Sequence, residues 1–198
     1  MTGIQLIRDT LARHREHPSI GLDITFPIYW QMDADLGKIV GNDLGEHGSW
    51  EIMRATPSLG DRIPARTGLY MFVFRSHLSL ALPNGATHRP TWVLYVGRAG
   101  SADSQRTLKD RYRGEYCKYV AGDPEQLWLA DSDRTRASTL KKYLSIWPLE
   151  YWYLIVDDRA KVPLLEDRLI KLFSPPLNRL GRLRVATGEP KPAFKVPE

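Results

Sequence analysis

The chain contains a single cysteine, Cys117, among its 198 residues. One cysteine excludes an internal disulfide framework and any multi-cysteine zinc or iron–sulfur site. Long apolar runs are also missing, since YWYLIV at 151–156 is far too short to span a membrane. The first residues, MTGIQLIRDTLARHREH, are charged and amphipathic and do not resemble a secretory signal. These absences predict a cytoplasmic protein without a membrane partner.

Basic residues are in moderate excess, with 28 lysines and arginines against 23 aspartates and glutamates and a net charge of +5. They cluster at 106–118, RTLKDRYRGEYCK, and in the tail after Asn178. Clustered cations suit a phosphate backbone. A solvated helix face and a soluble tail would have the same composition. The charge pattern therefore favours a nucleic-acid partner without requiring one.

Apolar patterning predicts an α+β protein with a small antiparallel sheet. The run at 149–157 is apolar almost throughout, which is typical of a central strand buried on both faces. Pro163 fits the first turn of the helix expected at 162–173. The other expected helices are 4–16, 104–120 and 135–147, and the other expected strands are 24–32, 49–53, 69–82 and 91–97.

The sequence PNGA at 83–86 lies between two strand-like runs, which is a strong hairpin signal. If Asn84 and Gly85 are the central turn residues, Tyr95 faces Phe74 and Tyr70 faces Ala99. Both phenols then lie on the same side of the sheet, roughly 13 Å apart along the strands. A bulge would have to bring them closer if they act together.

Glu166 occupies an unusual position in the helix expected at 162–173. On a wheel of about 100° per residue it falls inside the apolar arc, between Ile170 and Phe173. A bare carboxylate there is costly, so Glu166 must be paired, protonated or bound to a metal. One interpretation is an ion pair with an arginine. The other is a ligand for Mg²⁺, which takes one or two carboxylates and keeps several waters.

The remaining candidate residues each have an ordinary interpretation. Arg111 precedes Glu115 by four residues, which is the spacing of a helix-surface ion pair. Tyr70 and Tyr95, taken singly, are more typical of core aromatics than of catalytic groups. The functional signal lies in the order of these residues along the chain.

Five anchors resemble the GIY-YIG nuclease superfamily. They are GLY at 68–70, YVG at 95–97, Arg111 in TLKDRY, Glu166 in LLEDRLIKLF and Asn178 after SPPL. The first two match the family's glycine–tyrosine triplets, and the others match its helix-borne arginine, metal-binding glutamate and closing asparagine. Arg98 stands where many members have lysine. The resemblance covers about residues 66–180 and implies a three-stranded antiparallel sheet flanked by helices.

The resemblance implies an endonuclease that uses Mg²⁺, or another divalent cation such as Mn²⁺, to hydrolyse DNA. Its implied catalytic residues are Tyr70, Tyr95, Arg98, Arg111, Glu166 and Asn178, with Glu166 as the metal ligand. Tyr70 or Tyr95 would be the base, Arg111 would bind a phosphate oxygen, and Asn178 would pin the catalytic loop or the scissile phosphate. A repair, structure-specific or mobile-element nuclease and a non-catalytic nucleic-acid-binding module are the alternatives to a type II restriction enzyme.

The spacing of the anchors departs from that of compact family members. Twenty-four residues separate Tyr70 from Tyr95, and this enlargement resembles the restriction-enzyme branch. Where some of those enzymes carry a histidine, the helix bearing Arg111 offers Glu115 and Tyr116. We expect an extension at 1–66 that contacts DNA or mediates dimerisation, a nuclease domain at 67–180 and a basic tail at 181–198. A palindromic target would favour a homodimer.

Overall fold

The computed structural model describes residues 3–14, 34–120, 136–145 and 149–178. The strand expected at 24–32 and the tail at 181–198 lie outside these ranges. The described elements form a mixed α+β fold, which confirms the predicted class. Within these ranges, no helix has both the length and the apolar character of a membrane span.

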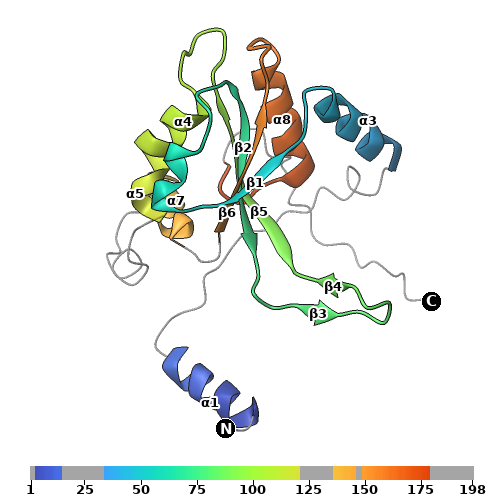
Figure 1. Cartoon of the computed structure of the whole chain (residues 1–198), viewed down its shortest axis with the longest axis vertical. Coiled ribbons are helices and arrows are strands. Elements are labelled where there is room, and N and C mark those ends of the chain that lie inside the picture. The colour runs from blue at the N-terminus through green and yellow to red at the C-terminus, as the bar shows by residue number, and fades with distance from the viewer. Residues whose placement is uncertain (1–2, 15–33, 121–135, 146–148, 179–198) are drawn as a thin grey trace, which may run out of the picture.

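A four-stranded antiparallel sheet forms the centre of the fold (Figure 1). Its order is β1 (Glu51–Arg54), β6 (Leu149–Ile155), β2 (Gly68–Arg75) and β5 (Thr91–Ala99). The expectation of three strands is wrong, because β1 adds a fourth by pairing with β6. β1 is short and mostly exposed, so its apolar pattern is weak. It belongs to the segment expected as an extension, and part of that segment is therefore built into the sheet.

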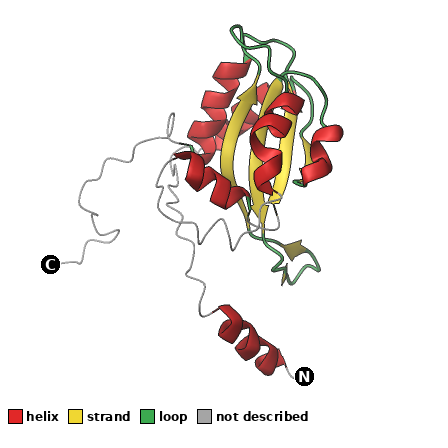
Figure 2. Ribbon diagram, turned by 90° about the vertical axis from the view of Figure 1, so that its left-hand side faces the viewer, coloured by secondary structure: helices red, strands yellow, loops and turns green. Residues whose placement is uncertain are grey.

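Helices cover both faces of the sheet (Figure 2). One face packs against α8 (Val162–Phe173) and α3 (Ala34–Gly45) through an aliphatic cluster. The other packs against α4 (Leu108–Arg111), a π-helical turn (Tyr112–Tyr116), α5 (Cys117–Val120) and α7 (Arg136–Leu144). A 3₁₀ helix (Pro57–Asp61) contributes Leu59 to this second, aromatic cluster. Strand β5 forms one edge of the sheet, between the two helical layers.

Most predicted helices are present with shifted ends. The first, α1, spans Gly3–His14, and α8 has the predicted bounds with Pro163 in its first turn. The helix expected at 104–120 begins only at Leu108, because Thr107 and Asp110 form a capping box. The helix α3 was not expected, because its three glycines lower its helix propensity. Burial of Val40 and Leu44 against the sheet compensates for that low propensity.

The long hairpin joins β2 to β5 through two short strands, β3 (Leu80–Ala81) and β4 (Thr87–His88). Its tip is a three-residue loop, because Leu82 and Ala86 pair and Gly85 takes a positive φ of 77°. The register predicted from a two-residue turn is therefore wrong, and where β2 pairs with β5 around Tyr70 and Tyr95 it differs by two residues. Tyr95 faces Phe72 there, and Tyr70 faces Gly97.

Candidate functional site

Five of the six predicted site residues line one cavity of about 660 Å³. They come from different elements: Tyr70 from β2, Tyr95 and Arg98 from β5, Arg111 from α4 and Glu166 from α8. The cavity thus brings together side chains that are up to 96 positions apart in the chain. Asn178 does not line it.

A bulge in the hairpin places Tyr70 and Tyr95 on the same face of the sheet. Between the pairs Val73–Val93 and Phe72–Tyr95, Leu94 is an extra residue on β5. Without this extra residue, the register of the Val73–Val93 pair would continue along the strands. Tyr95 would then project to the opposite face of the sheet from Tyr70. With it, the two rings lie on one face with centroids 6.2 Å apart. The bulge therefore sets the face of Tyr95, whereas the sequence led us to expect a bulge that shortens the distance between the phenols. The predicted shared face of the two phenols is confirmed.

The glycines of both triplets are required by close contacts. A Cβ atom at Gly97 would lie 2.5 Å from the phenol oxygen of Tyr70, which crosses over β5 at that point. A Cβ atom at Gly68 would lie 2.1 Å from the carbonyl oxygen of Leu154 on β6. Since real Cβ atoms do not approach so closely, any other residue would displace Tyr70 or split the sheet.

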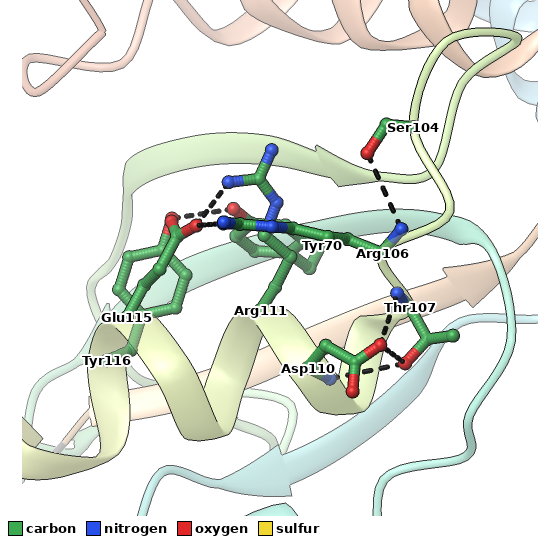
Figure 3. Close-up of polar contacts among 8 residues, drawn as sticks. All are labelled: Tyr70, Ser104, Arg106, Thr107, Asp110, Arg111, Glu115 and Tyr116. Atoms are coloured by element: carbon green, nitrogen blue, oxygen red, sulfur yellow. Dashed lines mark hydrogen bonds and ion pairs between the residues drawn. The ribbon is translucent and has the colours of Figure 1, made fainter.

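Tyr70 is the most buried group of the site, with 1% of its surface exposed against 8% for Tyr95. Its hydroxyl shares a hydrogen bond of 2.6 Å with the hydroxyl of Tyr116 (Figure 3). Burial, followed by the nearby phenols of Tyr116 and Tyr95, raises the pKa of Tyr70 well above its ordinary value. Tyr70 is therefore protonated at neutral pH.

Arg98 and Glu166 form an ion pair at the edge of the sheet, with Nη1 and Oε2 2.9 Å apart. Arg98 follows Tyr95 by three positions, so it projects to the face covered by α8. The cavity therefore wraps around the edge strand. The side chains remain 39% and 18% exposed, so the pair is open to water. One interpretation of Glu166 was an ion pair with an arginine, and that ion pair is present. The other was a metal ligand, which needs an open polar site, and Glu166 also lines the cavity.

Arg111 is held by Glu115, one helical turn further along (Figure 3). The same carboxylate oxygen of Glu115 accepts a second hydrogen bond of 2.6 Å from Arg106. Burial disfavours the charge on Arg111, but Tyr70 and Glu115 outweigh it and raise the pKa of the guanidinium. Among the described residues, nothing accepts a hydrogen bond from its buried Nε. Arg111 thus enters the cavity as a permanent cation with one donor unused.

Asn178 pins the edge strand and does not contact the cavity. Its side-chain oxygen accepts a hydrogen bond of 2.9 Å from the Val96 amide, and its side-chain nitrogen donates one of 2.8 Å to the Val96 carbonyl. The preceding Leu177 amide donates to the carbonyl of Leu94 at the bulge. These contacts hold β5 on both sides of Tyr95. Asn178 was predicted to hold the catalytic loop or the scissile phosphate, and in the structure it holds strand β5.

The residues at the other end of the cavity were not expected as site residues. This end is lined by Lys118 and Tyr119 of α5 and by Lys141 of α7. Both ammonium groups lie 5.0 Å from the centroid of the Tyr119 ring. No local pattern connects Lys141 with Lys118, because packing of α7 against α5 brings them together. Tyr116 was expected only as a residue standing near the histidine position of some restriction enzymes, and its hydrogen bond with Tyr70 was not expected.

The carboxylates of the cavity fit a singly anchored cation. In the described part of the chain, no group of three or more His, Cys, Asp or Glu residues could hold a metal ion. Glu166 supplies one carboxylate at an open, polar cavity. Magnesium is commonly held by one or two carboxylates with several retained waters, so this donor set suits it. It does not suit zinc, which prefers three or four nitrogen or sulfur ligands.

No protein-family model, curated protein or solved structure matches the chain.

Proposed function

We propose that the chain is a magnesium-dependent endonuclease that hydrolyses DNA phosphodiester bonds. One observation carries the proposal, namely that the cavity collects the phenols of Tyr70 and Tyr95, two guanidiniums and a solvent-accessible carboxylate from four separate elements. Its charge suits the substrate. Four basic side chains (Arg98, Arg111, Lys118 and Lys141) line it against two carboxylates, Glu115 and Glu166.

Arg111 is proposed to bind a non-bridging oxygen of the scissile phosphate. Its guanidinium stays charged, and its planar donors match phosphate geometry as negative charge grows in the transition state. Glu115 holds this guanidinium in the cavity before the substrate arrives. Arg98, at the other side of β5, would bind the same group once its pairing with Glu166 loosens.

Tyr95 is the proposed general base, and Tyr70 a positioning group. Burial holds Tyr70 protonated, and its hydroxyl is engaged with Tyr116. Tyr95 is the more exposed of the two phenols and lines the same cavity as Arg98 and Arg111. It would take a proton from the attacking water, whose oxygen forms a new bond to phosphorus as the bond to the 3′ oxygen breaks.

Glu166 is the proposed ligand for Mg²⁺. When bound, the ion supplies stabilisation for the charge on the leaving oxygen. Glu166 would also release Arg98 toward the phosphate, because its carboxylate cannot satisfy both cations equally. In the free protein the Arg98–Glu166 pair keeps both groups at the edge of β5.

The finer proposal is an enzyme similar to type II restriction endonucleases of the GIY-YIG kind. The order of the anchors and the long separation of the two triplets support it. A dimer and a cytoplasmic location belong to the same proposal. If it is correct, digestion of a plasmid of known sequence gives discrete fragments. A smear or structure-dependent nicking would favour a repair or structure-specific nuclease.

The test is plasmid nicking with Mg²⁺ by wild type, Glu166→Gln and Glu150→Gln. Glu150 forms the matched control pair with Arg75, at 3.1 Å and with side chains 36% and 20% exposed, outside the cavity. Loss of a metal ligand and its charge stabilisation is expected to slow nicking about a thousandfold. Glu150→Gln should nick as wild type does. Equal nicking by wild type and Glu166→Gln would refute the nuclease, and DNA binding without nicking would favour a non-catalytic module.

A further inference from the structure

The far end of the cavity holds two lysines around one aromatic ring. Lys118 and Lys141 come from different helices, and their ammonium groups both lie 5.0 Å from the ring centroid of Tyr119. The slight burial of Tyr119 raises its pKa, but hydrogen bonds and charge from the two lysines outweigh this and lower it. The whole group therefore carries a concentrated positive charge.

These two cations differ from the arginines at the reacting end. Arg98 and Arg111 are each paired with a carboxylate, Glu166 and Glu115 respectively. In the described part of the chain, no ion pair to Lys118 or Lys141 is found. Like charges brought together by two helices repel each other, and an anion bound between them would remove that cost.

An open stretch of wall connects the two ends. Gly114 lines the cavity between Arg111 and Lys118 in the sequence, and a Cβ atom placed there would meet nothing within 4 Å. Nothing in the packing of this position therefore requires a glycine. Since Gly114 lines the cavity, a side chain added there would border it.

We propose that Lys118 and Lys141 form a second phosphate subsite, which binds the phosphodiester next to the scissile one. The DNA strand then runs from the Arg98–Glu166 pair, over Gly114, to Lys118 on α5 and Lys141 on α7. The inference rests on the proposed function and adds the path of the strand. Lysine binds phosphate as a point charge, and the Tyr119 ring holds both ammonium groups at the cavity.

The path is tested by reversing charge at Gly114. Gly114→Lys and Gly114→Glu add side chains of similar length and opposite charge, and Gly37→Lys and Gly37→Glu on α3 are the matched pair. Gly37 is exposed, and a Cβ atom there also meets nothing within 4 Å. The measurement is fluorescence anisotropy of a fluorescein-labelled DNA duplex without divalent cations. We expect the Gly114 variants to differ about tenfold in dissociation constant, with the lysine variant binding more tightly. Equal differences at Gly114 and Gly37 would overturn the path.

The subsite itself is tested by removing its lysines. Lys118→Ala/Lys141→Ala is compared with Lys38→Ala/Lys171→Ala, which removes the same charge from lysines paired with Asp35 and Asp167. Loss of one phosphate contact should weaken binding about tenfold and reduce the slope of log affinity against log salt by about 0.9. An unchanged slope would overturn the subsite.

The two levels of the proposal fail in different ways. If wild type neither binds the duplex nor nicks plasmid DNA, the proposed function and the subsite are both refuted. If wild type binds and nicks, but the Lys118/Lys141 variant matches its Lys38/Lys171 control, only the subsite is refuted. Circular dichroism of each variant shows whether it is folded. If the double variant is unfolded, the Gly114 variants are used in its place, because they remove no contact. Equal differences in dissociation constant at Gly114 and Gly37 then overturn the proposal.

Discussion

The two faces of the sheet are built from different kinds of side chain. On the face covered by α3 and α8, the described buried residues are aliphatic or methionine, with no aromatic ring among them. On the face covered by α4, α5 and α7, the buried cluster contains seven tyrosines and Phe72. Those tyrosines are Tyr70, Tyr95, Tyr112, Tyr116, Tyr143, Tyr151 and Tyr153. The candidate site opens on the aromatic face.

A tyrosine layer can serve packing and chemistry at once. Each ring buries a large apolar area, while its hydroxyl needs a polar partner. Tyr70 and Tyr116 satisfy each other, and Tyr112 donates to the Thr56 carbonyl at 2.7 Å. The buried cluster described on the aliphatic face contains no tyrosine and contributes packing, and the polar pair Arg98–Glu166 lies at its open edge. Substitutions on the two faces should therefore have opposite effects on stability and activity.

The largest effect is expected for Tyr95→Phe. Removing the proposed base should lower the rate of plasmid nicking by about 10²–10⁴-fold, with little loss of stability because the ring remains. Tyr153→Phe is the control, since Tyr153 is also buried on the aromatic face but lies outside the cavity. Single-turnover nicking and urea denaturation measure the two quantities. Equal rates for both variants would show that Tyr95 has no role in the chemistry.

On the aliphatic face, Leu165→Ala should do the reverse. Leu165 is fully buried in α8, and truncation of a buried leucine costs about 3 kcal/mol through lost contacts and a cavity. The neighbouring Leu164 is exposed, so Leu164→Ala should change the free energy of unfolding by less than about 0.5 kcal/mol. Under conditions where Leu165→Ala is folded, its nicking rate should match wild type. A large loss of activity in folded Leu165→Ala would contradict the division between the faces.

The contrast between the faces was only partly predictable from the sequence. Glu166 stands out on the helical wheel because one charged residue interrupts an apolar stripe, and that signal is local. The shared face of Tyr70 and Tyr95 was predicted from a wrong register. The error was two residues, and since side chains alternate with period two, an even shift preserves the face. The bulge at Leu94 that makes this true leaves no clear local pattern.

Other parts of the site depend on contacts distant in sequence. Lys141 joins Lys118 only because α7 packs against α5, and periodicity within either helix cannot show this. The strand expected at 49–53 is present as β1, but its pairing with β6 was not expected, because its own mostly exposed residues do not reveal it. The glycines of α3 argue against a helix locally, and tertiary burial outweighs them. The missed features share this cause.

A smaller effect, of about 2 kcal/mol, is expected for Asn178→Ala. The substitution leaves the buried amide and carbonyl of Val96 without their side-chain partners, which costs the desolvation of both groups. Asn84→Ala is the control, because Asn84 accepts one hydrogen bond from Ala86 at the exposed hairpin tip. Urea denaturation measures stability. Nicking by Asn178→Ala should also fall, because β5 carries Tyr95, and a loss of stability alone would limit Asn178 to a role in folding.

The smallest effect concerns alkaline pH. Burial raises the pKa of Tyr70, and also those of Tyr112, Tyr116 and Tyr151. A raised folded-state pKa means that stability is complete below the unfolded pKa near 10 and is lost as the pH rises above it. Each such tyrosine should lower the free energy of unfolding by about 1.4 kcal/mol per pH unit in that range.

Tyr70→Phe removes one of these groups and should flatten the pH dependence above pH 10 by that amount. Tyr119→Phe is the opposite case, because its two lysines lower the pKa of Tyr119 despite its slight burial. Ionisation of Tyr119 therefore favours the folded state, and its loss should leave the alkaline decline as steep as in wild type or steeper. Urea denaturation at pH values from 9 to 11.5 measures both slopes. Identical flattening in the two variants would mean that the buried tyrosine layer does not set the alkaline limit of the fold.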